Sequence, residues 1–210
     1  MTNDVAKPHI GISYPSGFPE YYINDIFESI KSPGLKIDIR KEEPAIFASV
    51  EWMVPTFFAV YLLKPYFESF LAEAGKDHYL LLKKGLKELA KRVKGIGART
   101  IVSSQSPDKV AKNNDQSKIF SISIQTKSGR IIKLLFDNTL SEEDWDEAID
   151  TLFEYVAENY NNPLQGKLVE FTEGFRKEEY VQYYVIIDKE TKRIKFYDDM
   201  GIIKLHRENP

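Results

Sequence analysis

The sequence predicts an α+β fold with a mixed sheet, a central helical hairpin and a ββ-α-ββ C-terminal half. Three observations support this prediction. Apolar and polar residues alternate in two segments near the start, two long helix-like segments follow in the middle, and two hairpin-like pairs of strands flank an acidic helical segment. Of the 210 residues, 42% are hydrophobic and 29% are charged, which is an ordinary globular composition.

The N-terminal part predicts a β-α-β unit. Residues 9–14, HIGISY, alternate as a half-buried strand does, before a turn rich in Pro, Ser and Gly. Apolar side chains then recur at helical spacing over residues 22–30, with Pro19 suited to the helix start. Over residues 35–40, apolar residues again alternate with charged ones, which predicts a second half-buried strand.

A mostly apolar stretch, residues 44–63, precedes a basic segment, and together they predict the helical hairpin. We expect the first helix over about residues 50–73, with Gly75 ending it. The second helix is expected over residues 77–94, with apolar residues on one face and lysines on the other. Residues 98–102 are compatible with a third short strand.

The apolar stretch also raises the alternative of a membrane span. Such a span needs about 20 apolar residues. Glu51 interrupts the stretch and leaves a charge-free run of only twelve residues, 52–63. We therefore expect a helix buried inside the protein. Glu51 itself is either a functional carboxylate with a pKa raised by burial or a helix N-terminal carboxylate facing the macrodipole.

The C-terminal half predicts two hairpins around one helix. Residues 119–126 and 130–136 flank a Ser-Gly turn, and residues 180–187 and 193–197 flank a polar turn. Between the hairpins, apolar residues recur at helical spacing over residues 145–160. Ser and Asp residues before this helix have the spacing of a capping box.

The chain divides at a polar segment without periodicity. This segment, residues 103–117, separates a β-α-β plus helical hairpin subdomain at 1–102 from a ββ-α-ββ subdomain at 118–210. One continuous domain is the alternative, because a chain of this length can bury a single large core.

Charge is concentrated in the two long helical segments. Residues 76–99 hold eight basic and two acidic residues, and residues 137–160 hold nine acidic residues and no Lys or Arg. The candidate interaction residues are therefore these lysines and carboxylates: Lys83, Lys87, Lys91, Lys94, Asp146, Asp150 and Glu154.

Three interpretations of the basic segment stay open. It can bind an anionic surface, either nucleic acid or an acidic membrane. It can be an ordinary solvated helix face. It can also meet the acidic helix, within the molecule or between copies, because complementary potentials favour such an encounter.

The residue inventory excludes several chemistries. The absence of Cys removes disulfides, thiolate nucleophiles and zinc sites that need sulfur, and three widely spaced His do not suggest a metal site. Asp77 and His78 would form a base and its orienting group only with a nucleophile beside them, and no motif supplies one. We predict no catalytic residue, no metal site and no cofactor.

One family resemblance concerns the start of the chain. Ile12-Ser13-Tyr14, the helix that follows and the strand at residues 35–40 resemble the opening β-α-β unit of TIR domains. The resemblance implies a signalling or NAD-consuming domain. The rest of the chain departs from that family, and no Glu can be assigned to the family's NAD-cleaving position.

The sequence favours an intracellular, non-catalytic protein-interaction or regulatory module. No set of residues supplies a nucleophile, a base and an electrophile together. Two oppositely charged helices, with 12 Tyr and 13 Phe, favour contact with a protein partner or self-association. Residues 1–8 lack the pattern of a secretory signal, so we expect a cytoplasmic protein of a bacterial cell.

Overall fold

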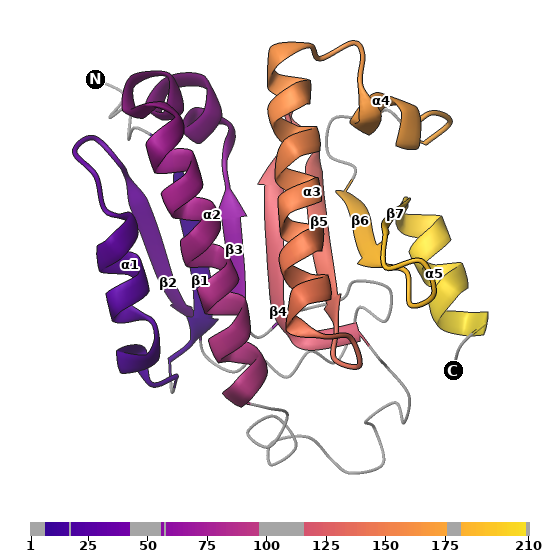
Figure 1. Cartoon of the computed structure of the whole chain (residues 1–210), viewed down its shortest axis with the longest axis horizontal. Coiled ribbons are helices and arrows are strands. Elements are labelled where there is room, and N and C mark those ends of the chain that lie inside the picture. Colours follow the sequence, from indigo (N-terminus) through magenta and orange to yellow (C-terminus); the bar gives the residue numbers. More distant parts are fainter. Residues whose placement is uncertain are drawn as a thin grey trace.

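The computed structural model describes residues 7–16, 18–42, 56, 58–96, 116–175 and 182–208 (Figure 1). Over these residues the strands are β1 (Ile10–Pro15), β2 (Ile37–Glu42), β3 (Phe58–Leu62), β4 (Gln116–Gln125), β5 (Ile131–Asp137), β6 (Gln182–Ile187) and β7 (Ile194–Tyr197). The helical elements are η1 (Glu20–Tyr22), α1 (Asn24–Ile30), η2 (Tyr66–Phe70), α2 (Leu71–Ile96), α3 (Glu142–Asn161), α4 (Lys167–Phe171) and α5 (Asp199–Glu208).

The strands form one mixed sheet of seven strands in the order β2-β1-β3-β4-β5-β6-β7. Parallel pairs (β1 with β2, β3 with β4, β5 with β6) alternate with antiparallel pairs (β1 with β3, β4 with β5, β6 with β7). The pairing of β3 with β4 joins the N-terminal strands to the C-terminal ones. Both parts of the chain therefore share one sheet and one main apolar core.

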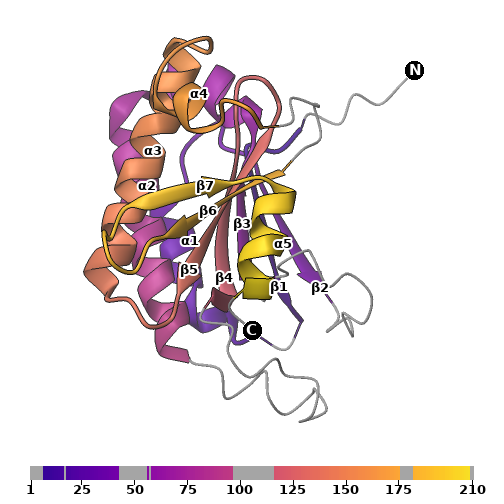
Figure 2. The same cartoon turned by 90° about the vertical axis from the view of Figure 1, so that its right-hand side faces the viewer.

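The helices lie on both faces of the sheet, but unequally. α1, α2 and α3 cover one face (Figure 1), and α5 packs on the other face beside β6 and β7 (Figure 2). On the face under α1, α2 and α3, the strands contribute buried residues at every second position, as the alternating burial of β1 shows. Packing against these side chains explains why α2 and α3 are amphipathic.

The structure confirms the α+β class and most of the predicted elements. The opening unit is β1, α1 and β2, with the two strands parallel. The C-terminal half follows the order β4, β5, α3, β6, β7, with α4 and α5 added. Ser141 and Asp144 form a full capping box at the start of α3, with hydrogen bonds of 3.1 Å in both directions.

The first helix of the predicted hairpin, expected over residues 50–73, is wrong at residues 58–62 and confirmed from Tyr66 onward. Residues 58–62 form β3, which is buried at four of its five positions, and helical structure begins only towards η2. The predicted end at Gly75 is confirmed as a kink inside α2, where its φ of 75° is not helical. α2 after this kink is the predicted basic helix.

Some predictions lie outside the described residues. These are the start of the apolar stretch with Glu51, the short strand at residues 98–102 and nearly all of the polar segment at residues 103–117. Across the described ranges, no helix is both long enough and apolar enough to cross a membrane.

Candidate functional site

The charged faces of α2 and α3 meet each other within the molecule. Asp150 of α3 forms ion pairs with two lysines of α2: Lys83 Nζ lies 3.0 Å from its Oδ1, and Lys87 Nζ lies 2.7 Å from its Oδ2. One turn further along α2, Lys91 Nζ lies 3.2 Å from Asp146 Oδ2. Of the three interpretations of the basic segment, an intramolecular contact with the acidic helix is the one that the structure contains.

The ion pairs change the acidity of Asp150. Burial alone would raise the pKa of its carboxyl group, but the hydrogen bonds with Lys87 and Lys83 outweigh burial and hold the pKa below its usual value. The ionised carboxylate is therefore the form that the α2–α3 contact stabilises.

The remaining candidates of this pair of helices also have local roles or face solvent. Lys94 Nζ donates to the carbonyl oxygen of Leu140 at 2.6 Å and lies 4.6 Å from the centroid of the Trp145 ring. Glu154 is exposed. The lysines of α2 that the sequence offered as an anionic-surface site are thus largely committed to contacts with α3 and the turn before it.

Asp77 and His78 do not form an acid–base pair. His78 is buried between α1 and η2, where its Nε2–H donates to the carbonyl oxygen of Ile30 at 2.8 Å. Nδ1 is then the acceptor for the hydroxyl of Tyr66, 3.1 Å away. Asp77 is exposed on α2. His78 therefore fastens helices to each other, and no group of three or more metal-ligating side chains occurs among the described residues.

The most distinctive surface among the described residues is the outer edge of β2. In the part of the chain that the structure describes, β2 pairs with β1 alone. The carbonyl oxygen of Lys36 accepts from the N–H groups of His9 (2.8 Å) and Ile10 (3.2 Å), so it points towards β1. Because backbone direction alternates along a strand, the N–H and C=O groups of Ile37, Ile39 and Lys41 point away from β1. We call these backbone groups of residues 37, 39 and 41 the β2 edge.

Successive side chains along β2 point to opposite faces of the sheet. Asp38 and Arg40 share the face opposite α1, where the Arg40 Nε donates to Asp38 Oδ2 at 2.9 Å. Ile39, on the same face as the helices, is 45% exposed, which is unusual for an isoleucine in a sheet. Lys41 forms an ion pair with Glu20 of η1.

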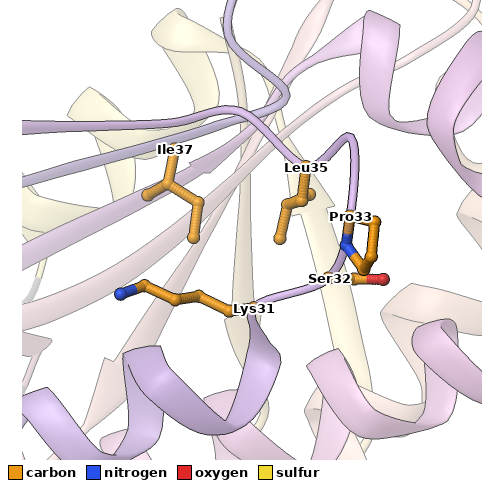
Figure 3. A pocket seen from close by; sticks show the side chains of 5 residues that line it. All are labelled: Lys31, Ser32, Pro33, Leu35 and Ile37. Carbon is orange, nitrogen blue, oxygen red and sulfur yellow. The ribbon is translucent and has the colours of Figure 1, made fainter.

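A hollow of about 450 Å³ opens beside the β2 edge. Lys31, Ser32 and Pro33 line it from the end of α1, and Leu35 and Ile37 line it from the start of β2 (Figure 3). Figure 3 shows the two apolar side chains pointing towards the stem of Lys31. An apolar hollow thus lies next to backbone hydrogen-bonding groups that point away from β1.

The opposite edge of the sheet, formed by β7, is less suited to pairing with another strand. β7 has four residues, against six in β2. Its Phe196 is covered by Phe171 of α4, whose ring stacks at 5.5 Å with an interplanar angle of 9°. Lys195, which is exposed, pairs with Asp188 of the preceding turn. Short strands and charged side chains are the usual protection of a sheet edge.

Sequence reasoning missed Lys133. This residue lies on the face of the sheet opposite α2 and α3, between Ser123 of β4 and Tyr184 of β6 in the strand register. Burial lowers the pKa of its ammonium group to about 8. The signal in the sequence was a single lysine inside the apolar strand IIKLLFD.

Comparison with known proteins adds no family to this picture. No protein-family model matches the sequence, and neither the curated proteins nor the solved structures contain a significant match. The β2 edge and its hollow are therefore interpreted from their own geometry.

Proposed function

We propose that this chain is a non-catalytic protein-interaction module that binds an extended polypeptide segment along the β2 edge. The observation that supports it is an edge strand that, among the described residues, pairs on one side alone and has an apolar hollow beside it. Addition of a strand to a sheet edge is a general mode of protein recognition, in which main-chain hydrogen bonds give affinity and side-chain pockets give specificity.

The β2 edge provides both parts of this mode. Its three outward residues offer N–H and C=O groups to an incoming strand, and each hydrogen bond formed contributes a net of about 0.5–1.5 kcal/mol. An apolar side chain of the partner that enters the hollow contacts Leu35 and Ile37, and full burial of such a side chain contributes about 1.5–3 kcal/mol. The two contributions together are of the size that a reversible interaction needs.

The alternatives have less support. Binding of nucleic acid or an acidic membrane would use Lys83, Lys87 and Lys91, which are paired with carboxylates of α3. The NAD-consuming role implied by the TIR resemblance depends on the β-α-β opening alone. A cytoplasmic setting is part of our proposal and depends on the sequence pattern.

The test is a peptide selection against the full-length chain, read out by amide hydrogen exchange. We expect selected peptides to slow exchange of the outward amides of Ile39 and Lys41, and to lose binding to the variant Ile39→Pro. Proline removes an N–H that points away from β1, so the β1–β2 ladder stays intact. Ile39→Val keeps the donor and is the matched control. Peptides that bind Ile39→Pro as well as the natural chain would refute the proposal.

A further inference from the structure

We propose that the strand bound at the β2 edge is β2 of a second copy of this chain, antiparallel and centred on Ile39. This inference rests on the proposed function and names its partner. The resulting dimer has two-fold symmetry and a sheet that continues from one copy into the other. Three features of β2 point to it: the direction of its backbone groups, the order of its charges and the exposure of its central isoleucine.

The backbone groups fit this centre. In an antiparallel pair, residues whose backbone groups face each other exchange two hydrogen bonds, and these pairs alternate with pairs that exchange none. With Ile39 opposite its own copy, both Ile39 residues present outward N–H and C=O groups. Ile37 then lies opposite the second copy's Lys41, and both of these also point outward. Every outward group of the β2 edge therefore meets another outward group.

The charges fit the same centre. Asp38 precedes Ile39 and Arg40 follows it, so each Asp38 lies directly opposite an Arg40 of the other copy. The two opposite pairs have no intervening hydrogen bonds, so their side chains are at the closest cross-strand spacing. Within one copy, Arg40 Nε already reaches Asp38 Oδ2 at 2.9 Å, so both side chains lie on the face where these pairs would form.

Neighbouring registers are disfavoured. Moving the centre to Arg40 places Arg40 opposite Arg40, and moving it to Asp38 places two Asp38 carboxylates opposite each other. Like charges directly opposite destabilise a strand pair. Centres between residues set outward backbone groups against inward ones and place side chains of opposite faces together. Among the registers centred on Asp38, Ile39 and Arg40, the charges of β2 therefore favour the one centred on Ile39.

The apolar residues gain most from this arrangement. Ile39, 45% exposed in the single chain, would lie against its own copy. Ile37, which lines the hollow, would face the aliphatic stem of Lys41 from the second copy. Both contacts remove apolar surface from water on the helix-bearing side of the joined sheet.

Sedimentation equilibrium of the full-length chain tests the pairing, with charge variants as the main probe. We expect a reversible monomer–dimer equilibrium. Asp38→Arg alone and Arg40→Asp alone each place like charges opposite each other twice, and each should raise the dimer dissociation constant by about tenfold or more. A mixture of these two variants restores both opposite-charge pairs, so the heterodimer should form more tightly than the homodimer of either variant. Lys84→Glu, on the exposed side of α2, is the control and should dimerise like the natural chain.

Folding is checked separately, by urea unfolding of each monomeric variant. Unfolding midpoints like that of the natural chain show that the edge residues act on assembly. A natural chain that stays monomeric at about 1 mM overturns the inference. So does a mixture of the two charge variants that stays monomeric. If peptides still bind at the β2 edge in that case, the proposed function survives with another partner, and if they do not, both fail.

Discussion

Lys133 gives the most direct prediction about stability. Burial in the sheet lowers its pKa from the ordinary value of 10.5 to about 8. At 1.36 kcal/mol for each pKa unit, this shift corresponds to a penalty of up to about 3 kcal/mol in the folded state wherever the lysine is protonated. Lys133→Met removes the charge and keeps the length of the side chain. We expect this variant to be more stable than the natural chain at neutral pH.

The sign of the pH dependence identifies the cause. Between about pH 8 and pH 10.5 the unfolded lysine binds more protons than the folded one, so the stability of the natural chain rises with pH in this window. The advantage of Lys133→Met is therefore full below about pH 8 and shrinks above it.

Urea unfolding at about pH 7 and about pH 9.5 measures this difference, with Lys84→Met as a control for the loss of one exposed charge. Burial also raises the pKa of Tyr66, Tyr79 and Tyr160, which costs stability at high pH, but this effect is common to both chains and cancels in the difference. An advantage that is absent, or equal at both pH values, would refute the reasoning.

Three further substitutions test the packing of the helices by urea unfolding. Asp150→Asn leaves two lysines of α2 without their carboxylate and should cost about 1 kcal/mol, because the site is partly exposed; an unchanged midpoint would contradict this. Gly75→Ala should cost about 1–3 kcal/mol, since φ 75° with ψ −176° is a conformation open to glycine alone. Gly85→Ala should cost about 1–3 kcal/mol, because the new Cβ would lie 2.9 Å from Cγ2 of Ile30, and a neutral result would mean that α1 moves freely.

The half-buried elements were predictable because their burial repeats with the period of the backbone. β1 has alternating buried and partly exposed positions, and its sequence alternates in the same way. α3 begins at Ser141, where the capping box could be recognised from spacing alone. In these elements one face packs on the core and the other faces solvent. The alternation of apolar and polar residues therefore reveals the secondary structure.

β3 was not predicted because neither of its faces is regularly exposed to solvent, so its sequence does not alternate between apolar and polar residues. It lies between β1 and β4 and is buried on both sides at most positions, so its residues form a continuous apolar run. Such a run looks the same whether it is a strand or part of a buried helix, and periodicity cannot separate the two. The length of the apolar stretch, residues 44–63, then led to the wrong prediction of a helix at the position of β3.

The role of the charged residues depended on packing that the sequence does not state. Lys83, Lys87 and Lys91 recur at the spacing of one helix face, and so do Asp146 and Asp150. Only the placement of α2 beside α3 on the same side of the sheet brings the two faces together (Figure 1). The spacing identified which residues are charged on each helix face. The placement of α2 beside α3 decided which lysine pairs with which carboxylate.

The same reasoning explains why β2 was recognised as a strand but not as an edge. Its alternation is that of any half-buried strand, and strand order decides whether its outer side is covered. At an edge, charged side chains usually prevent pairing with other chains, and a strand with only basic residues would repel a copy of itself. In the proposed dimer, Asp38 and Arg40, two residues apart around Ile39, would act differently: they would oppose the registers centred on Asp38 and Arg40 and favour the one centred on Ile39. If β2 were protected by charge alone, the natural chain would stay monomeric and a mixture of Asp38→Arg with Arg40→Asp would not associate, whereas a register-specific edge makes these two charge variants complementary to each other.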